Sequence, residues 1–395
     1  MKLTDIKFDT TNNDKVAIVV VGYNRLKSLQ RLLQSLLQAK YPSNDIPLII
    51  SIDASGEEEL YSYVQSFKWN HGPLYINIEE KRLGLRNHIY KCGDLCELFR
   101  AIILLEDDLV VSPYFYTYTL KILNVYGDDS RIAQISLYKN EMNGYVGLPF
   151  VNLQNGADVF LMQDVSTWGE CWNKRMWIEF KNWRDTHTDA DILDIDMPSA
   201  IKRWTRAWSK YYNAYVVDTN KFVLYPNVSV VTNFSDAGEH GGDNNSLVQV
   251  NLLQADFEYR LPEYDSLVKY DIYFNNVDLY KWICKDNKDL CLDIYGFGRL
   301  TEHHKFMLST EHLPYMVVQS YALNMRPIEL NIKMNISGSG IYLYDITKQK
   351  KIIKGTNNDL TSYYLRDFNV KRLLSFVCRH YMKALINKLV QCIKF

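Results

Sequence analysis

The first 138 residues alternate short apolar runs with segments of helical periodicity, and this alternation constrains the fold more than any other feature. Four apolar runs have the length and composition of buried strands: Val16–Gly22, residues 47–53, Leu74–Ile78 and residues 132–138. Between the first two lies Leu26–Gln38, whose leucines recur on one helical face. Strands that alternate with helices favour a mostly parallel sheet. We therefore predict an α/β fold with a Rossmann-like sheet flanked by helices.

A fifth apolar run, residues 101–111, contains the three consecutive carboxylates Glu106, Asp107 and Asp108. We expect this run to be a buried strand with the acids at its carboxyl end, where open α/β sheets bind ligands. Adjacent carboxylates repel one another unless a cation neutralises them, and such hard oxygen ligands suit Mg²⁺ or Mn²⁺. For an acidic triplet taken by itself, the alternative is a solvated turn after the strand.

Composition and missing motifs exclude several classes of protein. The net charge of −1 gives no case for nucleic-acid binding. No G-x-G-x-x-G follows the first strand and no P-loop sequence occurs, which argues against dinucleotide and Walker-type phosphate sites. The seven cysteines have no regular spacing, and we interpret them as reduced thiols. Because no signal-peptide region or transmembrane run is visible, we expect a cytoplasmic protein.

The character of the chain changes after residue 139. We expect Trp-bearing helices over residues 166–183 and 198–216, then a strand over residues 221–231 interrupted by Pro226. The polar, Gly-rich residues 232–242 have the composition of a mobile lid. These elements complete a first predicted domain, residues 1–250.

Two further regions follow the first domain. Residues 251–367 contain strand-like runs such as 328–336 and 340–346, which predict a smaller, mainly β accessory region. Residues 368–395 form a basic amphipathic helix, which suits the surface of an anionic membrane. The alternative is a terminal helix docked on its own domain.

Several weak motifs occur in an order that resembles a known family. The segments V-G-Y-N-R, I-S-I-D-A-S-G, R-L-G-L-R-N-H and L-L-E-D-D-L together resemble the GT-A nucleotide-sugar glycosyltransferases, particularly N-acetylglucosaminyltransferase I and related bacterial enzymes. The later segments S-T-W-G-E-C-W, W-S-K-Y-Y and L-Y-P-N-V-S-V-V-T-N resemble bacterial members that build surface polysaccharides. The resemblance covers roughly residues 14–245. It implies a GT-A fold and transfer of a sugar from a UDP-sugar, with Mn²⁺ or Mg²⁺ as cofactor.

The resemblance also implies roles for individual residues. Asp108 matches the acid that ligates the divalent cation, and Asp107 matches the acid that contacts the ribose or the sugar of the donor. Asp53 falls where the family holds the uracil ring with a carboxylate; taken alone, such an aspartate is more often a helix cap. The remaining donor-binding candidates are the loop residues Tyr23, Asn24 and Arg25, the pair Arg86 and His88, and His240 in the lid segment.

The general base is the point at which this chain departs from its relatives. Many bacterial members read W-D-x-x-W on the second Trp-bearing helix, whereas this chain has Ser209 at the position of the acid. A serine lacks the proton affinity of a general base. The remaining candidates are Glu170, in T-W-G-E, and Asp185, in N-W-R-D. For Glu170 the alternative is an exposed helix start, and for Trp168 and Trp172 a core position is an alternative to sugar stacking.

The sequence as a whole therefore predicts a cytoplasmic, metal-dependent, inverting glycosyltransferase. Its partners would be a UDP-sugar donor, a glycan or lipid-linked glycan acceptor, and a membrane surface for the C-terminal helix, with no nucleic acid. The main alternative is a sugar-nucleotide or glycan-binding protein with weak or no catalytic activity, which the loss of the family acid at Ser209 favours. A nucleotidyltransferase is a weaker alternative, because the loop after the first strand holds one glycine.

Overall fold

The computed structural model describes residues 14–236, 248–256, 258–283, 286, 288–299, 303–350, 359–366 and 368–393. The chain divides into two compact units, Met1–Asp278 and Leu279–Phe395, which we describe separately. The sequence-based boundary after residue 250 falls inside the first unit. Residues 251–278 include a short strand that pairs with the main sheet of that unit.

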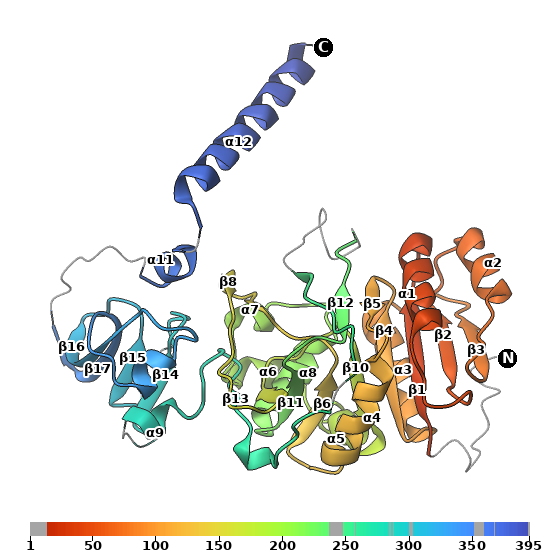
Figure 1. The fold of residues 1–395 in the computed structure, drawn as a ribbon, viewed down its shortest axis with the longest axis horizontal. Helices are drawn as coiled ribbons and strands as arrows, with labels where there is room; N and C mark the ends of the chain where they lie inside the picture. Colours follow the sequence, from red (N-terminus) through yellow and green to blue (C-terminus); the bar gives the residue numbers. More distant parts are fainter. Residues whose placement is uncertain are drawn as a thin grey trace. The chain divides into compact units, whose positions relative to one another are not determined.

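A nine-stranded mixed sheet forms the centre of the first unit (Figure 1). Its strands are β1 (Val16–Gly22), β2 (Leu48–Ile52), β3 (Leu74–Ile78), β4 (Ala101–Glu106), β6 (Ile132–Ser136), β9 (Val159–Met162), β10 (Glu170–Asn173), β11 (Phe222–Pro226) and β13 (Lys269–Tyr270). They lie in the order β13-β9-β11-β6-β10-β4-β1-β2-β3. Strands β4, β1, β2 and β3 are mutually parallel, whereas β10 is antiparallel to both β4 and β6.

Helices cover the sheet, as expected from its buried strands. Every residue of β1 and β2 is buried, which requires cover on both faces of the sheet. The helices of this unit are α1 (Leu26–Gln38), α2 (Glu58–Ser66), α3 (Leu85–Gly93), α4 (Phe115–Tyr126), α5 (Lys174–Arg184), α6 (Asp189–Asp194), α7 (Ser199–Lys202) and α8 (Ser209–Asp218). The predicted α/β fold, with a mostly parallel sheet flanked by helices, is therefore confirmed.

An aromatic core joins α3, α5 and α8 to the sheet. The Trp172 ring of β10 lies 5.0 Å from the Trp177 ring of α5, and Phe180 lies 4.4 Å from Tyr212 of α8. The Trp177 ring packs directly on Gly93 of α3, where a β-carbon would overlap it. Trp172 is fully buried, so the core interpretation of this residue is confirmed.

Three sequence-based elements differ from the structure of the first unit. The run 101–111 is not one strand: β4 ends at Glu106, and β5 (Leu109–Val111) turns away to pair antiparallel with β12 (Val231–Asn233). Residues 166–183 are not one helix, because residues 170–173 bond to β4 and β6 before α5 begins. Residues 198–216 contain a break between α7 and α8, where carbonyl groups accept hydrogen bonds from Arg86.

The second unit is built on a four-stranded sheet in the order β14-β15-β17-β16. The strands are β14 (Leu290–Asp293), β15 (Phe306–Ser309), β16 (Tyr315–Ala322) and β17 (Gly340–Gln349), and two of their three pairings are antiparallel. The helices are α9 (Leu279–Ile283), α10 (Leu330–Lys333), α11 (Asp359–Leu365) and α12 (Val370–Ile393). The smaller C-terminal sheet and the terminal helix were both expected.

In the first unit, a short hairpin of β7 (Met142–Asn143) and β8 (Leu148–Pro149) lies outside the main sheet.

The strand predicted for residues 328–336 is wrong, because this segment contains α10. Ile328 and Ile332 are buried at helical spacing, whereas Met334, which continues the alternating pattern, is 60% exposed. The buried Asn331 side chain accepts hydrogen bonds from the N–H groups of residues 324 and 325 and donates to two carbonyl groups. The backbone is therefore held in a compact turn that alternating hydrophobicity does not reveal.

Candidate active site

The carboxyl ends of β1, β2 and β4 bring the predicted donor-site residues to one edge of the sheet. The loop with Arg25 follows β1, Asp53 follows β2, and the acid turn, Asp107–Asp108, follows β4. A β-carbon on Gly22 would lie 2.9 Å from Cδ1 of Ile52 and 3.8 Å from Cβ of Asp107. The absence of a side chain at residue 22 therefore lets the three strand ends approach one another.

Arg25 links the loop after β1 to the acid turn. Its Nη1 donates to Oδ2 of Asp108 over 3.1 Å, and its Nη2 donates to Oδ1 of Asp107. Burial raises the pKa of Asp107 to about 6, although the charge and hydrogen bond of Arg25 lower it. Burial also acts to lower the pKa of the Arg25 guanidinium, but the two carboxylates outweigh it and raise that pKa. Sequence reasoning placed Arg25 on this loop without revealing this ion pair.

One carboxylate oxygen in the acid turn is free for a further ligand. Oδ1 of Asp108 is buried and has no hydrogen-bond partner among the described residues, although buried polar atoms are normally satisfied. Within the described ranges, no group of three or more His, Cys, Asp or Glu side chains is arranged to hold a metal ion. The unbonded Oδ1 of Asp108 would suit a Mg²⁺ or Mn²⁺ ion that takes one or two carboxylate ligands, with phosphate and water as the others.

Glu106 and Glu170 are two further carboxyl groups beside the acid turn; Glu170 is fully buried and Glu106 is half-buried. Burial and the neighbouring charges of Asp108 and Asp107 raise the pKa of Glu106 to about 8. Burial and the charge of Glu106 raise the pKa of Glu170 well above its usual value. Within the part of the chain that the structure describes, neither oxygen of Glu170 has a hydrogen-bond partner. Glu170 opens β10 and is fully buried, so the exposed helix start is wrong. The role of Glu170 as general base remains a prediction. Its burial favours the protonated form, which cannot accept a proton.

Asp53 holds the backbone at the start of α3. Its Oδ1 accepts the N–H of Leu83 over 2.8 Å, and its Oδ2 accepts the N–H of Gly84 over 2.9 Å. Its carboxylate is buried at 3% exposure, so these bonds replace its hydration. Contact with a uracil ring remains a prediction for Asp53, which now also has a structural role.

His88 and Arg86 both project from α3 into protein contacts. Nε2 of His88 lies 2.7 Å from Oγ of Ser51, and burial lowers the pKa of this imidazole against the raising effect of Asp53. Arg86 donates to the carbonyl of residue 205 over 2.7 Å, and its guanidinium lies 5.3 Å from the Tyr211 ring. The His88 contact couples α3 to β2, and the Arg86 contacts couple α3 to α8 and the segment before it. The predicted donor contacts of both residues remain untested.

The other sequence-based candidates lie in different surroundings. The Tyr23 ring is covered by the Arg82 guanidinium at 4.6 Å, and Asn24 is exposed. The Asp185 side chain is 56% exposed and pairs with the adjacent Arg184. His240 lies outside the described residues.

A cluster that joins α1 to the segment after β12 was not found from the sequence. Asp236 accepts a hydrogen bond from Oγ of Ser28 over 2.7 Å and pairs with Arg31. Nearby, the N–H of Phe234 donates to the backbone carbonyl of Asp108 over 2.8 Å. Asp236 and Ser28 are 208 residues apart, so no local pattern predicts their contact.

Comparisons with known proteins give distant matches. No family model matches the chain, and no curated protein sequence matches it. Among solved structures, S. aureus TarS 1-349 is 14% identical over 55% of this chain and 59% of that chain, with a TM-score of 0.37. The mannosyltransferase PcManGT from Pyrobaculum calidifontis, in complex with GDP-Man and Mn²⁺, is 12% identical over 45% of this chain and 49% of its own, with a TM-score of 0.31. GalNAc-T7 with UDP, GalNAc and Mn²⁺ is 13% identical over 55% of this chain and 43% of its own, with a TM-score of 0.38.

The match to TarS 1-349 spans less than two thirds of that chain.

Proposed function

We propose that this protein is a metal-dependent, inverting glycosyltransferase of the GT-A type. It would transfer a hexosyl or N-acetylhexosaminyl group from a UDP-sugar to a glycan or a lipid-linked oligosaccharide. The observation that carries the proposal is the free, buried Oδ1 of Asp108 beside the Arg25 guanidinium, at the carboxyl ends of β1 and β4. This is the edge at which open α/β sheets bind ligands. The family-like motifs supply the residues of this edge in the expected order.

The roles of the residues follow from their charges. Asp108 would hold the divalent cation through its free oxygen, and Asp107 would contact the ribose or sugar of the donor. A bound Mn²⁺ or Mg²⁺ would stabilise the negative charge that develops on the departing diphosphate. Arg25 fixes both acids in place and keeps positive charge at the same edge. Asp53, which follows β2, and Arg86 and His88, on α3, would support the donor.

Inversion of configuration requires a base within reach of the acceptor hydroxyl. Glu170 and Asp185 are the candidates from the sequence. Glu170 lies beside the donor edge but is buried with a raised pKa, whereas Asp185 is exposed and paired with Arg184. Either role would require the side chain to change its surroundings when acceptor binds. The identity of the base is therefore part of the proposal and separate from the metal role of Asp108.

Asp108→Asn tests the proposal directly. We expect this variant to lose UDP-sugar turnover by about 100-fold or more, because an amide is a poorer ligand for a hard cation and removes a fixed charge. The assay would measure UDP release from a panel of UDP-sugars with Mn²⁺, with and without EDTA. Asp128→Asn is the matched control, since Asp128 is an exposed aspartate in the turn after α4. Undiminished Mn²⁺-dependent turnover by Asp108→Asn would overturn the assigned metal role.

A non-catalytic sugar-nucleotide or glycan-binding protein is the second candidate function. Ser209 in place of the family acid and the burial that raises the pKa of Glu170 favour this candidate. Calorimetry with UDP-sugars, followed by a donor hydrolysis assay, separates the two functions. Binding without turnover across donors and acceptors would favour the binding protein.

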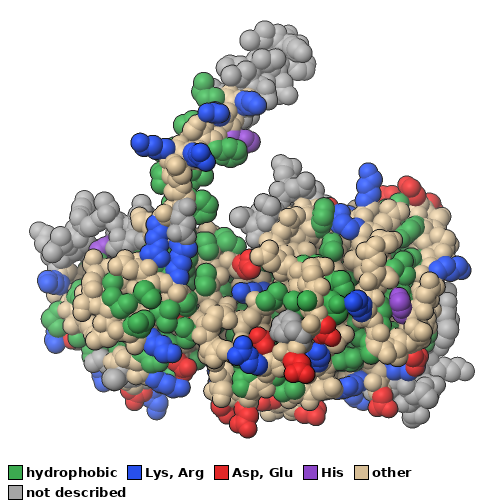
Figure 2. Space-filling model, in the orientation of Figure 1, with side chains coloured by type: hydrophobic (Ala, Val, Ile, Leu, Met, Phe, Trp, Pro, Cys, Tyr) green, Lys and Arg blue, Asp and Glu red, His purple; other side chains and the backbone are tan. Residues whose placement is uncertain are grey.

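We further propose that α12 lies on the anionic inner face of a membrane, close to a lipid-linked acceptor. Figure 2 shows basic and hydrophobic side chains along the described part of this helix, with no acidic ones. The basic side chains of this part are Lys371, Arg372, Arg379 and Lys383. All residues from 370 to 383 are exposed, including Phe376 at 67% and Tyr381 at 72%. Among the described residues, no helix is both long and apolar enough to cross a membrane.

A further inference from the structure

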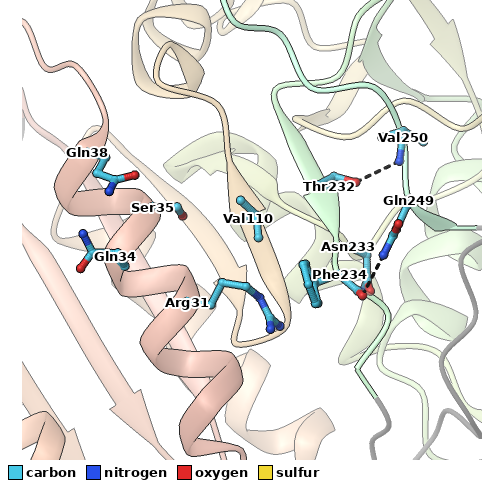
Figure 3. Close-up of a pocket in the computed structure, with 10 residues that line it drawn as sticks. All are labelled: Arg31, Gln34, Ser35, Gln38, Val110, Thr232, Asn233, Phe234, Gln249 and Val250. Atoms are coloured by element: carbon cyan, nitrogen blue, oxygen red, sulfur yellow. Dashed lines mark hydrogen bonds between the residues drawn. The ribbon is translucent and has the colours of Figure 1, made fainter.

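A pocket of about 460 Å³ lies on the flank of the first unit, between α1 and the β5–β12 ribbon. Figure 3 shows α1 on one side of it and β12 with residues 249–250 on the other. Its volume is within the range of small-molecule sites. The lining residues are Arg31, Gln34, Ser35, Gln38, Val110, Thr232, Asn233, Phe234, Gln249 and Val250. None of them is among the donor-site residues predicted from the sequence.

The wall formed by α1 is polar, and its two glutamines are available for a ligand. Its four residues occupy positions i, i+3, i+4 and i+7 and therefore share one face of the helix, opposite the buried leucines. Gln34 and Gln38 are exposed, and their amide groups have no hydrogen-bond partner in the part of the chain that the structure describes. Each amide offers both donors and an acceptor.

The opposite wall is held in place by hydrogen bonds. Oγ1 of Thr232 accepts the N–H of Val250 over 2.9 Å. Nε2 of Gln249 donates to the carbonyl of Phe234 over 3.0 Å, as Figure 3 shows. The carbonyl oxygen of the Gln249 side chain is then left to accept a bond from a ligand. The Phe234 side chain adds an apolar surface that is 45% exposed.

The charge of the pocket selects the class of ligand. Arg31 is the one charged side chain among the lining residues. Its guanidinium pairs with Asp236 and lies 3.5 Å from the centre of the Phe234 ring, so its charge is already compensated. A nucleotide would need an unpaired cation for its phosphates, and a metal ion would need carboxylates. Neither is present among the lining residues, whereas amides beside an aromatic surface suit hydroxyl groups on a ring.

We propose that this pocket binds one or two residues of a neutral glycan, at a site separate from the donor edge. The ribbon that forms one wall continues directly from the acid turn, and the N–H of Phe234 bonds to the carbonyl of Asp108. A glycan held here would be anchored through sugars distant from the one that reacts. Only this use as an acceptor anchor rests on the proposed transferase function; glycan binding itself does not.

The test measures saccharide binding to the full chain by saturation-transfer difference NMR. The probes are neutral glucose, galactose, N-acetylglucosamine and their β-linked disaccharides, each with and without UDP. We expect binding that UDP does not displace, and a loss of affinity of about fivefold for each amide removed in Gln34→Ala and Gln38→Ala. Gln65→Ala is the matched control, because Gln65 is an exposed glutamine on α2. Circular dichroism checks that each variant is folded.

Several outcomes would overturn this proposal. They are the absence of saccharide binding, displacement of the saccharide by UDP, and affinity that is unchanged in both glutamine variants. Binding of uridine monophosphate that Gln34→Ala and Gln38→Ala weaken would assign the pocket to a nucleotide instead. Asp108→Asn should retain saccharide binding, so failure of the donor-site proposal is distinguishable from failure of this one.

Discussion

Asp164 is a buried carboxyl group whose pKa is raised even though its oxygens accept two hydrogen bonds. It accepts bonds from the Tyr145 hydroxyl over 2.5 Å and from Nδ2 of Asn140 over 2.9 Å. Burial raises its pKa from 3.8 to about 6, because the lost hydration outweighs the lowering effect of both bonds. The side chain is 8% exposed, so solvent screening is weak.

The raised pKa of Asp164 predicts a pH-dependent contribution to stability. Because the folded pKa is above the unfolded one, the stabilising effect is complete below pH 3.8 and is lost as the pH rises to about 6. The ionised group should cost at most about 3 kcal/mol of unfolding free energy at neutral pH. Asp164→Asn removes this titration. Urea unfolding from pH 4 to 7 should therefore show the variant gaining stability relative to wild type as the pH rises, and Asp128→Asn should show no such gain. A difference that stays constant with pH would contradict the prediction.

Individual site residues were predictable from the sequence only in part. The positions of Arg25, Asp53 and Asp108 at one edge follow from the strand ends, because parallel strands place their carboxyl ends together. The hydrogen-bond partners of the site residues could not be predicted in the same way. The N–H groups of residues 83 and 84 donate to the Asp53 carboxylate, and Arg31 pairs with Asp236; these groups are near one another only after folding.

At the scale of elements, periodicity located the first half of the chain well. Val16–Gly22, Leu26–Gln38 and Leu74–Ile78 were predicted with the bounds that the structure gives. Each has a strong apolar pattern and packs against elements that are close to it in the sequence. The Trp-rich half was harder, because β10 inserts antiparallel between β4 and β6, and this long-range pairing overrides local helical spacing.

The contact of α3 with α5 gives a prediction at this scale. Gly93→Ala places a β-carbon within the Trp177 ring, which is itself packed against Trp172 and Phe180. We expect a loss of roughly 1–3 kcal/mol in the free energy of unfolding, since a well-packed core resists an added methyl group. Urea denaturation measures this loss. Gly144→Ala is the control, because a β-carbon there meets nothing within 4 Å. Equal stability of the two variants would contradict the packing of α5 on α3.

At the scale of the whole molecule, charge is distributed unevenly along the chain. The net charge is −1, yet residues 370–395 contain six Lys and Arg residues and no Asp or Glu. On the described part of α12, Arg372, Arg379 and Lys383 lie on one side of the helix. Leu374, Val377 and Tyr381 occupy the opposite side, which is the arrangement of a helix that lies in a membrane interface.

Vesicle sedimentation of the full chain tests this arrangement. We expect binding to vesicles that contain phosphatidylglycerol, weak binding to pure phosphatidylcholine, and release as salt screens the charges. Arg379→Gln combined with Lys383→Gln should weaken binding about 30-fold, because each cation near an anionic surface contributes about 1 kcal/mol. Lys68→Gln combined with Lys174→Gln removes two exposed cations from the first unit and should leave binding unchanged. Equal affinity for neutral and anionic vesicles would mean that α12 does not act through its charge.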